Sequence, residues 1–155
     1  MKVRNGFVSN SSSSSFICCI AQIKDREKVQ NWISTLVLNE YENEYDYSIQ
    51  KSKNINKNTG GLLQRDTNGN LVVNSFMASV SLDRSKIDDN DEILSINIVN
   101  NEGDCGSFYP DYDGDIDYDI DLDFFDDNQI EIYNGLNEEN GFGLINKTYG
   151  AGRNG

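Results

Sequence analysis

The stretch FICCIAQIKDREKVQNWI, residues 16–33, decides the expected fold class. Its first eight residues are almost continuously apolar, and this length and composition predict a buried strand over residues 16–23. Asp25 follows where a helix N-cap belongs. Apolar side chains then recur at helical spacing and predict one amphipathic helix over residues 26–40; they are Val29, Trp32, Ile33, Leu36 and Val37.

Strand patterns fill most of the remaining chain. Tyr45, Tyr47 and Ile49 alternate with polar residues, as in a half-buried strand. LLQR and LVVNSFMASVSL flank an Asn68-Gly69 pair, which predicts a hairpin because glycine tolerates positive φ. ILSINIV (93–99) and QIEIYNG (129–135) predict two more strands. We therefore expect an α+β domain with one amphipathic helix packed on a mainly antiparallel sheet of five to seven strands.

The 155 residues suffice for one such domain. Residues 1–15 end in a serine run and are expected to form a flexible arm. Residues 16–143 would then form the domain. Residues 144–155 are rich in glycine and are expected to form a tail.

Charge is divided unevenly along the chain. The formal net charge is −13, yet residues 87–146 hold 18 of the 26 acidic residues and no lysine or arginine. The rest of the chain carries eight acids against all 13 bases. A surface formed by the acidic half would repel nucleic acid and anionic membranes and attract cations or basic proteins.

The densest part is the acidic segment, DYDGDIDYDIDLDFFDD, residues 111–127. Within it aspartates occupy one parity (115, 117, 119, 121, 123) and apolar residues the other, which predicts a strand with one buried face. Aspartates two residues apart on a strand are about 6.8 Å apart. Repulsion between two such charges in water is about 0.6 kcal/mol, a cost that a buried apolar face can offset.

Four interpretations of this segment remain open. In the first, its charges pair with Lys51, Lys53 and Lys57 across the sheet. In the second, they form a solvated face that prevents a further strand from pairing at the edge. In a third interpretation, Asp111, Asp113 and Asp115 bind calcium. The order is not that of an EF-hand, because the glycine is fourth and the twelfth position is Leu122.

The fourth interpretation is mimicry of nucleic acid. B-DNA advances about 3.4 Å per phosphate on each strand, so the aspartate spacing matches every second phosphate. We then expect the segment to bind a basic surface of another protein, such as a nucleic-acid-handling protein. The protein itself would not bind nucleic acid directly. The partner-binding residues would be Asp111, Asp113, Asp115, Asp117, Asp119, Asp121, Asp123, Asp126 and Asp127.

The sequence offers little for catalysis. The chain has no histidine, so Ser–His and Cys–His mechanisms lack their base. Three cysteines, Cys18, Cys19 and Cys105, do not supply a zinc site and are expected to be reduced thiols in a cytoplasmic protein. No segment has the roughly 20 apolar residues of a membrane span. We expect a non-enzymatic protein with no cofactor other than calcium.

The opening MKVRNGFVSNSSSSSF, residues 1–16, resembles the start of assorted uncharacterised proteins from bacteriophages and some bacteria. The resemblance implies a phage accessory protein and attaches no activity to the leader. Combined with the acidic segment, it favours an inhibitor that acts in the host cytoplasm. The alternatives are a structural component of a phage particle and a calcium-stabilised binding domain.

Overall fold

The computed structural model describes residues 12–36, 43–56, 62–75, 78–102, 109–113 and 127–154. Short 3₁₀ helices lie at η1 (Ser52–Asn54), η2 (Arg84–Lys86) and η4 (Glu138–Asn140). The longer elements are β1 (Ser12–Ile23), α1 (Arg26–Ile33), β2 (Asn43–Lys51), β3 (Leu63–Arg65), β4 (Leu71–Asn74), β5 (Ser79–Leu82), β6 (Glu92–Glu102), β7 (Tyr109–Asp113), α2 (Asp127–Gly135) and β8 (Phe142–Asn154).

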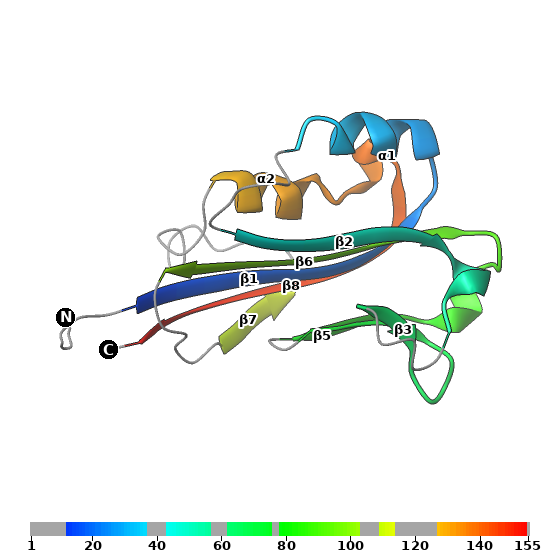
Figure 1. Cartoon of the computed structure of the whole chain (residues 1–155). Helices are drawn as coiled ribbons and strands as arrows, with labels where there is room; N and C mark the ends of the chain where they lie inside the picture. Colours follow the sequence, from blue (N-terminus) through cyan, green and yellow to red (C-terminus); the bar gives the residue numbers. More distant parts are fainter. Residues whose placement is uncertain are drawn as a thin grey trace.

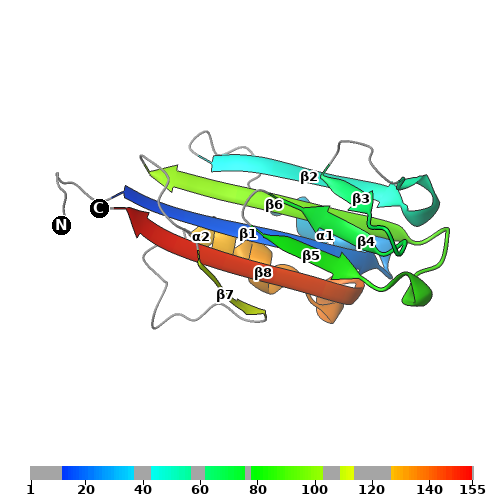
Figure 2. The ribbon, with the colours of Figure 1, turned by 90° about the horizontal axis from the view of Figure 1, so that it is seen from below.

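The described elements form three layers (Figure 1). A five-stranded sheet has the order β2-β6-β1-β8-β7, and every neighbouring pair is antiparallel. Both helices cover one face of this sheet, and a three-stranded antiparallel sheet, β3-β4-β5, covers part of the other (Figure 2). The prediction of an α+β fold is confirmed, with the strands divided between two sheets. Neither described helix is long or apolar enough to cross a membrane.

The central strand β1 is buried on both faces. Ile17 and Cys19 pack into the core beneath the helices, whereas Phe16, Cys18 and Ile20 pack into the core beneath the small sheet. This double burial explains why residues 16–23 lack polar alternation, since a strand with two covered faces needs apolar side chains on both.

Helix α1 begins where the sequence predicts and ends earlier. The Asp25 carboxylate accepts a hydrogen bond from the Lys28 N–H at 3.3 Å. The helix ends at Ile33, not at residue 40, so the predicted extension is wrong for residues 34–36. The hydroxyls of Ser34 and Thr35 donate to the carbonyls of Asn31 and Trp32 at 2.7 and 2.6 Å, and such bonds compete with continued helix.

The strand predicted over residues 129–135 is wrong, because these residues belong to α2. Three side chains face the core at helical spacing: Gln129, Ile132 and Tyr133. Gln129 is fully buried and its side-chain oxygen accepts a hydrogen bond from the Ser15 hydroxyl at 3.2 Å. Because the first of these buried residues, Gln129, is polar, the apolar residues alone did not show helical spacing.

Both predicted terminal boundaries are also wrong. Residues 12–15 belong to β1, so the part of the expected arm that is described is sheet; residues 1–11 lie outside the described residues. Residues 144–154 form most of β8, which pairs with β1 over most of its length and with β7 on its other side. Tyr149 of this strand is fully buried, so sheet pairing and core packing outweigh the low strand propensity of its glycines.

Candidate functional site

The acidic segment is described only at its two ends. Asp111 and Asp113 lie on β7, the outer strand of the large sheet, and Asp127 is the exposed first residue of α2. The remaining candidate residues, Asp115, Asp117, Asp119, Asp121, Asp123 and Asp126, lie outside the described residues. The aspartate ladder therefore stays a prediction.

Packing fixes the elements at both ends of this segment. β7 pairs with β8, which in turn pairs with the central strand β1. At the other end, Ile132 and Tyr133 of α2 are fully buried. The Lys147 ammonium on β8 donates to the carbonyls of Tyr133 and Leu136 at 2.8 and 3.4 Å, a favourable position for a cation at a helix C-terminus. The segment thus starts on a strand of the large sheet and ends at the first residue of a packed helix.

The edge strand β7 has several features that discourage strand addition. It has only five residues, it contains Pro110, and its register with β8 shifts between Pro110 and Tyr112. Short length, proline, irregularity and charge each hinder pairing with a further strand. These features make β7 a poor template for a further strand.

The lysines proposed as internal partners lie elsewhere. Lys51 ends β2, at the opposite edge of the sheet, where its Cα is paired with that of Glu92. Three strands separate β2 from β7, a distance of about 19 Å at 4.8 Å per strand step, which exceeds the Debye length of about 8 Å at physiological salt. Lys53 follows in η1, and Lys57 lies outside the described residues. Lys51 is therefore too far from β7 to neutralise Asp111 and Asp113. Whether the three lysines neutralise the aspartate ladder stays open, because residues 115–123 lie outside the described residues.

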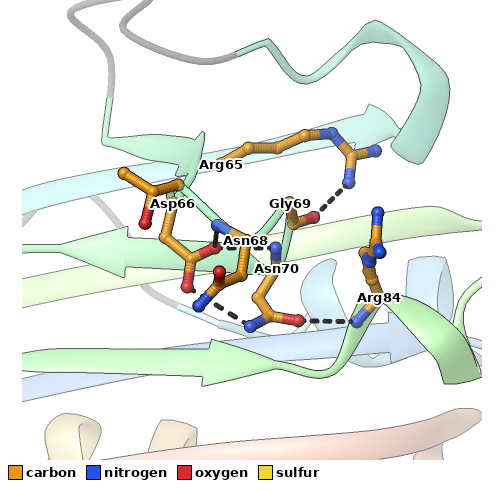
Figure 3. Close-up of a pocket in the computed structure, with 7 residues that line it drawn as sticks. Arg65, Asp66, Asn68, Gly69, Asn70 and Arg84 are labelled. Carbon is orange, nitrogen blue, oxygen red and sulfur yellow. Dashed lines mark hydrogen bonds between the residues drawn. The ribbon is translucent and has the colours of Figure 1, made fainter.

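The structure also contains a surface hollow that the sequence reasoning missed. Seven residues at the β3–β4 turn and at the start of η2 line an open depression of about 630 Å³: Arg65, Asp66, Thr67, Asn68, Gly69, Asn70 and Arg84 (Figure 3). Arg65 and Arg84 also border a neighbouring depression of about 340 Å³. In sequence, the only signal was Arg65 beside the predicted Asn68-Gly69 turn.

Arg65 has a structural role in this hollow. Its guanidinium donates to the carbonyls of Ile55, Gly69 and Ser52, each at 2.8 Å, and thereby joins the β3–β4 turn to η1. Arg84 is exposed, lies against Gly69, and has no ion pair within the described residues (Figure 3). Arg84 is thus the cation of the hollow that remains available to solvent.

The nearby carboxylates stabilise turns. Desolvation raises the pKa of Asp66, but hydrogen bonds from Asn70 and Asn68 outweigh it, and the pKa lies below its usual value. Hydrogen bonds from the Ser85 N–H and hydroxyl lower the pKa of Asp83. A lowered pKa keeps a carboxylate ionised near neutral pH, so both acids accept the hydrogen bonds that hold these turns.

The described cysteines are buried thiols. Desolvation raises the pKa of Cys18 to about 12, and burial together with the adjacent Cys18 raises that of Cys19. A thiol with so high a pKa is not a nucleophile near neutral pH. Among the described residues, no group of three or more Cys, Asp or Glu side chains is arranged to hold a metal ion. The calcium hypothesis also needs Asp115, which lies outside those residues, and it stays a prediction.

Comparison with known proteins found no match. No protein-family model matches the chain, and neither a curated protein nor a solved structure matches it.

Proposed function

We propose that the protein is a non-enzymatic binding protein whose acidic segment occupies a basic surface of another protein. One observation carries the proposal. The segment holds nine aspartates and no lysine or arginine, and it connects the outer edge of the sheet to the helical layer between two packed ends. A segment held at both ends loses less conformational entropy on binding than a free tail.

Charge distribution supports the same proposal. At the β7 edge, recognition by side-chain charge is favoured over strand pairing, and Lys51 is too distant to neutralise this edge. The partner class that fits is a protein with a surface built for a phosphate backbone, such as a host nucleic-acid-handling protein. The resemblance of the leader to phage proteins supports an inhibitory role in the host cytoplasm.

The proposal predicts selective capture of basic proteins from a host lysate. We expect the wild type to retain such proteins at 50 mM salt, and a variant with Asp115, Asp117, Asp119, Asp121 and Asp123 changed to Asn to lose at least nine-tenths of them. Mass spectrometry of the retained fraction measures this.

A matched control removes five negative charges elsewhere. Five acids outside the acidic segment are exposed and form no ion pair within the described residues: Glu27, Asp88, Asp89, Glu138 and Glu139. Their change to Gln or Asn gives the same net charge as the segment variant. We expect this control to retain the partners. Equal loss in both variants would show that net charge, and not the segment, is responsible.

A further inference from the structure

The two outer strands of the large sheet differ in how they are protected. β7 is short, irregular and interrupted by Pro110. β2 has nine residues, contains no proline, and pairs with β6 without a register shift from Asn43 to Lys51. Its outer side has no neighbouring strand among the described residues (Figure 2). A long regular edge of this kind is a template for a further strand.

β2 also carries exposed apolar surface. Tyr47 is 45% exposed and Ile49 is 37% exposed, and these are the large hydrophobic side chains that remain open in the described part of the chain. Their register partners on β6 are Ile96 and Leu94, which pack beneath the helices, so both side chains lie on the helix-covered face at its margin. Adding a strand beyond β2 would cover them.

The sequence of β2 suits pairing with itself. An antiparallel partner centred on Tyr47 aligns all nine residues, placing position 45 opposite 49 and Tyr47 opposite Tyr47. In this register Glu44 faces Gln50, Asp46 faces Ser48 and Lys51 faces Asn43, so no like charges are opposed. Centring on Asp46 would instead set two aspartates opposite each other.

We propose that β2 is a dimerisation edge, and that its occupant is the β2 of a second copy in antiparallel register about Tyr47. The two large sheets become one ten-stranded sheet with the helices of both copies on the same side. Both β7 strands then lie at its outer edges, about 43 Å apart at 4.8 Å per strand step. The dimer does not depend on the function of the acidic segment, but it would present two such segments.

Light scattering of the full chain tests the interface. We expect the wild type to have the mass of a dimer at 100 μM, and Tyr47→Glu to have that of a monomer, because it opposes two charges at the centre of the interface. Ser79→Glu, an equal charge change at an exposed strand position on β5, should remain a dimer. A monomeric wild type at 100 μM would overturn the proposal, as would a dimeric, folded Tyr47→Glu variant.

Disulfide trapping tests the register without relying on a disruptive variant. Directly opposed Cα atoms in antiparallel strands are about 4.5–5.5 Å apart, within the range that a disulfide spans. In a Cys105→Ser background, Tyr47→Cys should form a covalent dimer on mild oxidation. Gln50→Cys, exposed on the same strand, should not, because its symmetry mate would be about 20 Å away. Failure of Tyr47→Cys to cross-link, or equal cross-linking of both, would contradict the register.

Discussion

Gly135→Ala is expected to lower the free energy of unfolding by about 2–3 kcal/mol. Gly135 is the last residue of α2, and a Cβ at this position would lie 2.6 Å from Cε2 and Cζ2 of Trp32. The indole ring has little freedom to move, because it is 8% exposed and packs edge-on against Phe142 with ring centroids 5.5 Å apart. Overpacking a rigid core usually costs about 1–3 kcal/mol.

Helix propensity predicts the opposite sign for the same change. In a helix interior, alanine is favoured over glycine by up to about 1 kcal/mol, and at the last helical residue, where Gly135 lies, only part of this preference applies. The two effects separate in a Trp32→Leu background, where the indole is absent and Gly135→Ala should become neutral or slightly stabilising. Urea denaturation of the four proteins in this double-mutant cycle measures the coupling. A destabilisation that is unchanged in the Trp32→Leu background would show that the Trp32 contact is not its cause.

Gly141→Ala is expected to cost about 3 kcal/mol or more. Gly141 has a φ of +98°, a conformation that costs a residue with a Cβ about 1–2 kcal/mol. Its Cβ would also lie 2.6 Å from the backbone oxygen of Asp25, at the start of α1. The backbone cannot shift to relieve this contact without breaking hydrogen bonds, because the Gly141 carbonyl accepts from the N–H groups of Lys24 and Asp25 at 2.8 and 2.9 Å.

Gly69 provides the matched control for this prediction. Its φ is +86°, but the nearest atom to an added Cβ is Cδ of Arg84 at 3.0 Å, on a flexible and exposed side chain. We expect Gly69→Ala to cost only the conformational part, about 1–2 kcal/mol. Thermal and urea unfolding of both variants compare the two positions. Equal losses at Gly69 and Gly141 would mean that the contact with Asp25 adds nothing.

The parts of the fold that the sequence predicted are those where one local signal was decisive. The apolar run over residues 16–23 indicated the buried central strand, and Asp25 marked the first turn of α1, which its carboxylate does cap. The Asn68-Gly69 pair marked a real turn, in which the Gly69 N–H donates to the Asp66 carbonyl at 3.0 Å. Each of these signals depends only on neighbours in sequence.

Errors arose where tertiary contacts outweighed local composition. Gln129 is polar and yet buried, because Ser15, more than a hundred residues earlier in the chain, donates to it. The glycines of β8 suggested a tail, but β1 and β7 pair with this strand on both sides. Likewise, nothing in the sequence indicated that Arg65 would bind three carbonyls of η1 and the β3–β4 turn. None of these contacts has a signature in the local composition.

For the candidate site, the sequence predicted charge better than geometry. Composition located the acidic segment, and the structure places Asp111 and Asp113 on an outer strand and Asp127 at the start of a packed helix. The position of Lys51 across three intervening strands depends on strand order. Strand order is set by the whole fold. The spacing of residues in the sequence therefore could not show whether Lys51 lies near the acidic segment.

The salt dependence of binding to a captured basic partner tests the central claim most directly. Charge recognition by the acidic segment predicts that the wild-type Kd rises at least tenfold between 50 and 300 mM salt. At 50 mM salt the five-Asn segment variant should bind at least tenfold more weakly than the wild type, and the control with five other acids removed should stay within threefold. A wild-type Kd that is unchanged across this salt range would contradict the account.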